Sequence, residues 1–273
     1  MKGCAIVATH HKTGTVWMQS VFRRIAKARK LKFVTVQRSA GYAEAALVLP
    51  CVVFNHHSDF KKSGWMLGHP QCRIFHLIRD PRDIVLSAAR HHRTAAEAWL
   101  HKPMKSFGGK TYQEQINSLP DDHSRFSFEM QNSAKRTIRD IRKWNYNLPN
   151  SLECRYEDLI ADIEMKKFTE VLLHLGFEQS ELDTCREIIR NNSLFGKVHR
   201  DRRAHIHSGQ PGQWKDTFNS VLAAEFIAAF GDVLIELGYE NDNSWANSLP
   251  PPSNAPKAGV AALAAADEIE YVK

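Results

Sequence analysis

The most constraining feature of the sequence is a run near its start, residues 5–17, in which an apolar segment turns directly into an amphipathic one. The four small apolar residues at 5–8 are typical of a strand buried on both faces of a parallel sheet. Apolar residues then recur at i, i+3, i+4 and i+7, which predicts the buried stripe of a helix: Met18, Val21, Phe22 and Ile25. A polar turn containing a lysine and a glycine lies between the two segments. Because a helix N-terminus has unpaired N–H groups and the positive end of the dipole, this turn predicts a phosphate-binding site.

The residues of this turn resemble a known nucleotide-binding motif. In a Walker P-loop, the nearest alternative, glycines precede the lysine, whereas Lys12 precedes Gly14 here. Residues 9–17 resemble the first motif of the sulfotransferase family, Thr-Tyr-Pro-Lys-Ser-Gly-Thr-Thr-Trp, whose members transfer a sulfuryl group from 3'-phosphoadenosine 5'-phosphosulfate (PAPS). The matching residues are Thr9, Lys12, Gly14, Thr15 and Trp17. Thr13 keeps the hydroxyl of the usual serine, whereas Val16 removes one donor. Without the resemblance, the run is an ordinary turn with a surface lysine.

A second motif follows a predicted strand at residues 73–78. Asp80 suits a helix N-cap and Pro81 the first helical position, so a helix is predicted to begin here. Residues 79–87 resemble the family signature Arg-Asn/Asp-Pro-Lys/Arg-Asp-x-x-x-Ser, whose arginine and serine bind the 3'-phosphate of PAPS. Arg79 and Ser87 keep the eight-residue spacing. The resemblance implies that both hold this phosphate, and Ser87 is also counted among the catalytic residues.

Two adjacent histidines are candidates for the general base. A strand predicted over residues 48–54 ends in Asn55-His56-His57. In sulfotransferases the corresponding strand ends in Thr-His-Leu-Pro, and that histidine is the base. His56 matches when the strand ends are aligned, and His57 matches when counting back from the next motif. We favour His56 and keep His57 as the alternative. Imidazole suits the role because its pKa lies near neutral pH.

Three further segments resemble the adenine site of the family. Residues 156–159 resemble Tyr-Glu-Asp-Leu/Met, whose tyrosine approaches adenine, which places Tyr156 there. Residues 192–195 resemble the segment in which a hydroxyl residue and a phenylalanine flank the base, which implies Ser193 and Phe195. Trp17 would lie on the other side of the ring. Each of these aromatic residues is equally consistent with an ordinary core position.

The last motif departs from the family pattern. Residues 207–215 resemble Arg-Lys-Gly-x-x-Gly-Asp-Trp-Lys, whose first three residues bind the 3'-phosphate. Here His207 stands for the arginine and Ser208 for the lysine, whereas Gly209 is kept. Histidine lacks the permanent charge and bidentate fork of arginine, so another residue is needed for that contact, and Arg202 and Arg203 are the nearest candidates.

Composition limits the alternatives. The 273 residues are 43% hydrophobic, enough for one sizeable core. The formal charge of +7 favours an anionic partner, and PAPS is a sufficient one. The sequence has no stripe of basic residues interleaved with aromatic ones, so we expect no nucleic-acid partner. Of the five cysteines, Cys4, Cys51, Cys72 and Cys154 lie in or beside apolar runs, and the cysteines are predicted to be buried thiols without a disulfide framework. Paired histidines on a strand point to opposite faces, so we expect no metal site.

We expect one sulfotransferase domain over residues 1–246, with residues 92–127 as an acceptor-binding or lid insertion. Disorder is the alternative for residues 102–110. The tail from 247 to 273 is rich in proline and alanine, and we expect it to be disordered. The first apolar run is too short for a signal peptide or membrane helix, so we expect a cytoplasmic protein without a membrane partner. The dimer motif of cytosolic sulfotransferases is not recognisable around residues 215–225, which leaves the oligomeric state open.

Together the motifs predict an α/β fold, with three α/β/α layers around a central parallel sheet of about five strands, as in P-loop nucleotide kinases. The implied reaction moves sulfuryl from PAPS to a hydroxyl or amine of a small molecule or glycan, leaves 3'-phosphoadenosine 5'-phosphate (PAP) and uses no metal. Lys12 would stabilise the leaving oxygen, while Thr13, Gly14 and Thr15 would bind the 5'-phosphate. The alternatives are a P-loop-like kinase and a catalytically silent PAP-binding protein.

Overall fold

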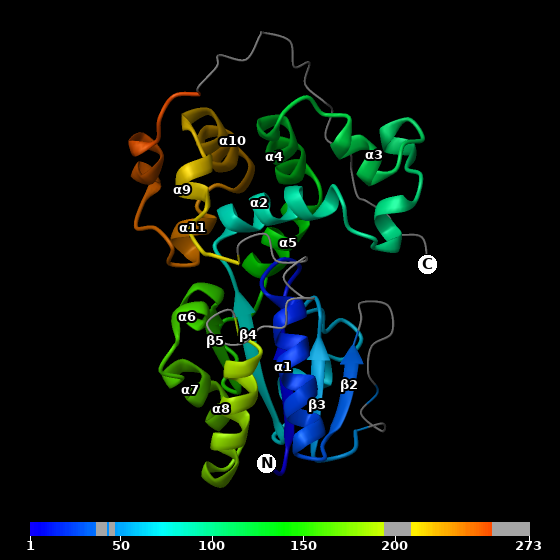
Figure 1. The fold of residues 1–273 in the computed structure, drawn as a ribbon, viewed down its shortest axis with the longest axis vertical. Coiled ribbons are helices and arrows are strands. Elements are labelled where there is room, and N and C mark those ends of the chain that lie inside the picture. The colour runs from blue at the N-terminus through cyan, green and yellow to red at the C-terminus, as the bar shows by residue number, and fades with distance from the viewer. Residues whose placement is uncertain (37–42, 44–46, 194–208, 253–273) are drawn as a thin grey trace. The chain divides into compact units, whose positions relative to one another are not determined.

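The computed structural model describes residues 1–36, 43, 47–193 and 209–252, which fall into two compact units (Figure 1). Unit 1 comprises residues 1–80 and 143–211, and unit 2 comprises residues 81–142 and 212–273. The predicted domain, residues 1–246, draws on both units. The described chain continues past residue 246, through the end of a 3-10 helix, η7 (Asn243–Ser248), to residue 252, whereas residues 253–273 lie outside the described part.

Unit 1 is built on a five-stranded parallel sheet with the strand order β2-β3-β1-β4-β5 (Figure 1). The strands are β1 (Cys4–Ala8), β2 (Lys32–Val36), β3 (Cys51–Asn55), β4 (Cys72–Ile78) and β5 (Ser151–Arg155). This sheet and its flanking helices confirm the predicted α/β class. The strand order reverses direction at β1, and in such sheets ligands bind beyond the carboxyl ends of the strands at the reversal.

The two faces of the sheet have different covers within unit 1. On one face lie α1 (Thr15–Ala28), α7 (Lys166–His174) and α8 (Leu182–Asn191), with the predicted stripe of α1 fully buried. Two short elements, α6 (Tyr156–Ala161) and η5 (Gln179–Glu181), precede α7 and α8 respectively. The opposite face is covered by η2 (Gly64–Leu67) and by irregular segments that bring Phe60 and Trp144 onto it.

Three cysteines lie side by side at the amino end of this sheet. Cys4 of β1 is in register with Cys51 of β3 and with Cys72 of β4, and all three are buried. Hydrogen bonds to the other two thiols, together with burial, raise the pKa of the Cys4 thiol. Burial also raises the pKa of Cys154 to about 12 and that of Cys185 to about 11. All five cysteines are free thiols, as predicted.

Unit 2 is helical in its described part. Its longer helices are α2 (Pro81–His92), α4 (Asp122–Gln131), α5 (Ser133–Arg142) and α10 (Ser220–Phe230). α4 packs against the other three. The shorter elements are η3 (Ala98–His101), η4 (Lys105–Phe107), α3 (Tyr112–Asn117), α9 (Trp214–Thr217) and α11 (Val233–Glu236). No helix in the described ranges has the length and apolarity needed to cross a membrane.

Two sequence-based boundaries differ from the structure. The strand predicted from residue 48 begins at Cys51, because Pro50 has no N–H to offer the ladder. The helical spacing of Phe230, Val233, Leu234 and Leu237 predicts one closing helix that ends at Gly238, and the prediction of a single helix is wrong. α10 ends at Phe230 because Gly231 takes a left-handed φ of 57°, and α11 is a separate turn. The predicted end at Gly238 is confirmed by its φ of 68°.

The predicted insertion, residues 92–127, contains η3, η4, α3 and the start of α4. A capping box starts α3: the Thr111 hydroxyl accepts a hydrogen bond from the Glu114 N–H, and the Glu114 carboxylate accepts one from the Thr111 N–H. Residues 102–110, for which disorder was the alternative, include η4 and a single antiparallel bridge from Pro103 to Thr111. The described structure therefore gives this segment a defined local conformation.

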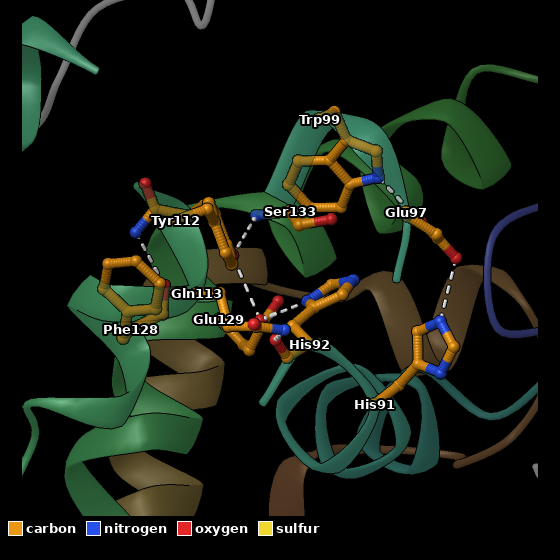
Figure 2. Close-up of polar contacts among 10 residues, drawn as sticks. His91, His92, Glu97, Trp99, Tyr112, Gln113, Phe128, Glu129 and Ser133 are labelled. Atoms are coloured by element: carbon orange, nitrogen blue, oxygen red, sulfur yellow. Dashed lines mark hydrogen bonds and ion pairs between the residues drawn. The ribbon is translucent and has the colours of Figure 1, made fainter. Parts of the chain in front are cut away.

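A buried polar cluster ties the insertion to α2 and α4 (Figure 2). His92 Nδ1 lies 2.6 Å from Glu129 Oε1, and both side chains have no exposed surface. The Tyr112 hydroxyl donates to the same oxygen at 3.0 Å, and the Ser133 N–H donates to the Tyr112 oxygen. Glu129 Oε2 is buried and has no hydrogen-bond partner in the described chain. All the donors to this carboxylate therefore converge on one oxygen.

Aromatic rings surround the cluster. His92 meets the Trp99 and Tyr112 rings edge-on, at centroid distances of 5.0 and 5.3 Å. The Trp99 indole N–H donates to Glu97, which also contacts His91 at 2.8 Å. These two hydrogen bonds hold the pKa of Glu97 down at about 2, the His91 bond being the stronger influence. The cluster thus fixes both ends of the 92–112 segment within unit 2.

Candidate active site

The turn between β1 and α1 is held by its own hydroxyl groups. The Thr13 and Thr15 hydroxyls both donate to the His10 carbonyl, at 2.8 and 2.7 Å. The Thr13 oxygen also accepts from the His10 N–H at 2.9 Å. Lys12 and Gly14 have left-handed φ angles of 67° and 98°, which wind the chain tightly into the helix. Thr13 is fully buried, so its side chain builds the turn.

Beyond this turn the first residues of α1 present unpaired donors. Within the described chain, the backbone N–H groups of residues 14–17 have no hydrogen-bond acceptor, and the first turn carries neither an acidic residue nor a side-chain cap. Trp17 Nε1 and Thr9 Oγ1 are buried polar atoms that also lack a partner among the described residues. Unpaired N–H groups at the positive end of a helix of this length favour an anion. These residues therefore fit the phosphate end of a nucleotide.

Tyr156 brings several predicted site residues together. A Cβ atom on Gly14 would lie 3.0 Å from the Tyr156 ring, so glycine is required by contact as well as by φ. The Arg79 guanidinium lies 4.6 Å from the centre of the same ring, and the Trp17 ring meets it edge-on at 5.9 Å. The Tyr156 hydroxyl donates to the Gly209 carbonyl at 2.6 Å. Residues from the first, second and last motifs thus meet at the side chain of Tyr156.

Arg79 links the end of β4 to the turn. Its Nη1 donates to the Lys12 carbonyl at 3.2 Å, and its side chain is almost completely buried. The next residue, Asp80, donates its N–H to the Glu157 carboxylate, whose pKa is raised by burial. Ser87, its predicted partner at the 3'-phosphate, lies on α2 in unit 2.

His56 and His57 follow β3 at the same edge of the sheet. His56 Nε2 lies 3.1 Å from the side-chain nitrogen of Gln19 on α1, and its ring meets Phe54 edge-on at 5.0 Å. Burial, and secondarily the charge of Arg23, lower the pKa of His56. The His57 N–H donates to the Asn55 side chain at 3.2 Å. The centres of the two histidine rings lie 6.4 Å apart, so both histidines lie in the same part of the molecule and both remain candidates for the general base.

A chain of polar groups that runs from two buried histidines to an exposed glutamate was not predicted from the sequence. His10 Nε2 lies 2.8 Å from His76 Nε2 of β4, and His76 Nδ1 lies 3.3 Å from Glu153 of β5. The His76 ring also stacks on Trp144 at 4.1 Å. Burial lowers the pKa of His76, and the hydrogen bond to Glu153 opposes this. The contact depends on the register of β1 and β4, which places Ala8 beside His76 and which no local pattern reveals.

A second missed contact organises the last motif within unit 2. Asp83 accepts hydrogen bonds from the Gly212 and Trp214 N–H groups, at 2.7 and 3.1 Å. The Arg82 guanidinium lies 3.5 Å from the centre of the Trp214 ring and pairs with Glu240 at 2.6 Å. In the sequence Asp83 suits the first turn of the helix that begins at Pro81, and this position alone does not indicate a partner. The complete burial of Arg82 and Asp83, which does indicate one, is visible only in the structure.

The remaining predicted site residues make few contacts with the turn or lie outside the described part of the chain. The Ser193 hydroxyl is buried and donates to the Ile189 carbonyl of α8. Val16 is largely exposed. Phe195, His207 and Ser208, with Arg202 and Arg203, lie outside the described residues. Across the described part of the chain, no three histidine, cysteine or carboxylate side chains are grouped as a metal site requires.

Comparison with known proteins identifies the family of this chain. Residues 3–238 match the sulfotransferase domain family, which is most of the chain. The chain belongs to the sulfotransferase family. As a sulfotransferase it is an enzyme that transfers sulfuryl from PAPS. Comparison with curated proteins found no match.

Solved sulfotransferase structures share the fold. Mouse sulfotransferase SULT7A1, crystallised with PAP, matches with a TM-score of 0.58 and 15% identity over 90% of this chain and 87% of that chain. Retinol dehydratase, crystallised with androsterone and PAP, matches with a TM-score of 0.54 and 16% identity over 85% of this chain and 80% of that one. At such identities the likeness concerns the fold.

Proposed function

We propose that this sulfotransferase modifies a hydroxyl or amine group of a small-molecule or glycan acceptor at the carboxyl edge of the unit 1 sheet. The observation that carries the proposal is the set of unpaired donors at the start of α1, beside Lys12 and next to Tyr156. Androsterone in the retinol dehydratase structure supports a small-molecule acceptor. The fold supports nucleotide binding at this edge, because the strand order reverses there.

Different residues would bind different parts of the nucleotide. PAPS, when bound, supplies the sulfuryl group. The N–H groups of residues 14–17 and the Lys12 ammonium would hold its 5' end, while Thr13 shapes the turn from within. Trp17 and Tyr156 would contact the adenine side, together with Ser193 and Phe195. The 3'-phosphate would be bound by Arg79, Ser87, His207, Ser208 and Gly209.

Two residues carry the proposed chemistry. The Lys12 ammonium stabilises the negative charge that develops on the leaving oxygen, which is the form of electrostatic stabilisation that catalyses most in group transfer. His56 accepts the proton of the acceptor group on its ring. A half-buried imidazole with a lowered pKa is neutral near pH 7, which is the state that a base requires.

Nucleotide binding and turnover test the function against its alternatives. We expect PAP to raise the melting temperature of the full chain and ATP with Mg²⁺ to leave it unchanged, because the turn offers unpaired N–H groups without the glycine pattern of a P-loop. Stabilisation by ATP with Mg²⁺ alone would indicate the kinase. Labelled PAPS with phenols, alcohols, amines and sugars then identifies the acceptor, and PAP binding without transfer to any of them would indicate the silent binding protein.

We expect His56→Ala to reduce turnover about 10²- to 10⁴-fold, the usual contribution of a general base, without weakening PAP binding. The base contacts the acceptor and not the nucleotide, so calorimetric titration with PAP should give the wild-type affinity. His57→Ala is the matched control, because it changes the same side chain one residue along the same loop. A loss of turnover in His57→Ala with none in His56→Ala would assign the base to His57.

A further inference from the structure

We infer that Gln19 is a positioning residue for His56: its side-chain amide orients the imidazole and selects the ring nitrogen that carries the lone pair. This inference rests on the proposed role of His56 as the base. It concerns α1, whose N-terminus was assigned above to the nucleotide and whose second turn faces the base.

The contact is made by a helix against the residue that follows a strand. Gln19 lies in the second turn of α1, and its side-chain nitrogen is 3.1 Å from His56 Nε2. The Phe54 ring supports the imidazole from β3, at 5.0 Å and 79°. Because α1 packs against β3, both partners stand on rigid elements. His56 is thus held from two sides, although it lies in a loop.

The chemistry of the contact discriminates between protonation states. A neutral imidazole has one donor and one acceptor nitrogen, whereas an imidazolium has two donors. With the amide nitrogen of Gln19 facing the ring, Nε2 must be the acceptor, and only the neutral ring can provide one. Because Nε2 then holds the only lone pair of the neutral ring, the acceptor group must displace the amide from Nε2 before its proton can be transferred there. The protonated Nε2 can afterwards donate to the Gln19 carbonyl. Glutamine can serve both states because it has a donor and an acceptor on one side chain.

The positive charge near His56 also disfavours protonation of its ring. Arg23 lies one helical turn beyond Gln19 on α1 and places a positive charge near the ring. Its guanidinium is held 4.9 Å above the Phe33 ring, so the charge has a defined place. His57 is the titratable neighbour on the same loop. Arg23 and the donor side of Gln19 both disfavour an imidazolium, which keeps His56 available as a base.

The test replaces the amide by a carboxylate of the same shape. In Gln19→Glu the ring gains an anionic acceptor, which favours the imidazolium. We expect the pKa of His56, followed by NMR titration of its ring protons, to rise by about one pH unit or more. The acid limb of the kcat/KM profile should move upward by the same amount, with activity lost at pH 7 and recovered at higher pH. Recovery at high pH is not expected if the change only disturbs folding.

Two further variants make the result decisive. Arg24→Gln makes the same change of net charge on an exposed residue of α1 that lies with the α8 residues Ile188 and Asn191, so it should leave the pKa of His56 unchanged. Gln19→Leu removes the hydrogen bond without adding charge. It should lower kcat about tenfold with little change in KM for PAPS.

An unchanged His56 titration in Gln19→Glu, or equal shifts in Gln19→Glu and Arg24→Gln, would overturn the inference. The NMR titration does not require turnover. A wild-type rate in His56→Ala would therefore refute the proposed base while leaving the Gln19 contact to be judged by its own measurement.

Discussion

Replacing Lys12 by alanine is expected to abolish measurable sulfuryl transfer while leaving the fold intact. The lysine lies at the turn before α1, and removal of one charge-stabilising group at a leaving oxygen typically costs 10²- to 10³-fold or more in kcat. The Lys12 carbonyl, which accepts a hydrogen bond from Arg79, is retained in the variant. Single-turnover assays with labelled PAPS measure the loss, and the melting temperature reports on the fold.

The chain provides a matched control for Lys12→Ala. Lys30 also has a left-handed φ, 54°, but it follows the far end of α1 and is exposed. Lys30→Ala therefore repeats the backbone effect of the substitution without touching the proposed site, and its turnover should equal that of the wild type. Near wild-type turnover in Lys12→Ala would refute the site, and equal losses in both variants would mean that backbone strain causes the defect.

Replacing Glu129 by alanine is expected to destabilise unit 2 by about 1–3 kcal/mol, the usual cost of leaving a buried hydrogen-bonding group without its partner. His92 would be left with no exposed surface and no carboxylate, and the Tyr112 hydroxyl would lose its acceptor (Figure 2). Circular dichroism of the helices during urea unfolding measures the effect. The His92→Leu/Glu129→Leu double variant should be less destabilised than Glu129→Ala, because it removes both partners and leaves no polar group at position 92 without one.

An exposed pair of the same type serves as the control. His123 and Glu225 lie 3.1 Å apart and connect α4 to α10, with side chains about a third exposed. Glu225→Ala should cost less than about 1 kcal/mol, since exposed pairs contribute little. Similar losses in Glu129→Ala and Glu225→Ala would show that burial of the His92 pair has no special effect on stability.

The features that were predicted correctly from the sequence depend on residues that are close together in the chain. The apolar run at residues 5–8, the stripe of α1 and the Pro81 helix start each depend on local spacing, and each is confirmed. The last closing helix was wrong because its apolar residues keep a helical period across Gly231, whose backbone conformation interrupts the helix. Periodicity alone does not reveal such an interruption.

The contacts that the sequence could not predict join residues far apart in the chain. Strand register brings His10 to His76, and the packing of α1 on β3 brings Gln19 to His56. Asp83 reaches the Gly212 and Trp214 N–H groups across 129 and 131 residues. The motifs thus named the groups proposed to contact the nucleotide, whereas the residues that hold those groups in place became visible only in the fold.

The distribution of cysteines makes the two units distinguishable by chemistry. All five cysteines belong to the sheet-containing unit 1, and each is buried there as a free thiol, whereas residues 81–142 and 212–273 contain none. A thiol-reactive reagent can modify these side chains only when unit 1 opens, because all five are buried, and burial also raises the pKa of Cys154 and Cys185. The labelling rate therefore measures the opening of unit 1 and is silent to unit 2. Helical circular dichroism has contributions from both units, so helical signal that persists after the thiols are labelled would show that the helices of unit 2 unfold separately from the sheet of unit 1.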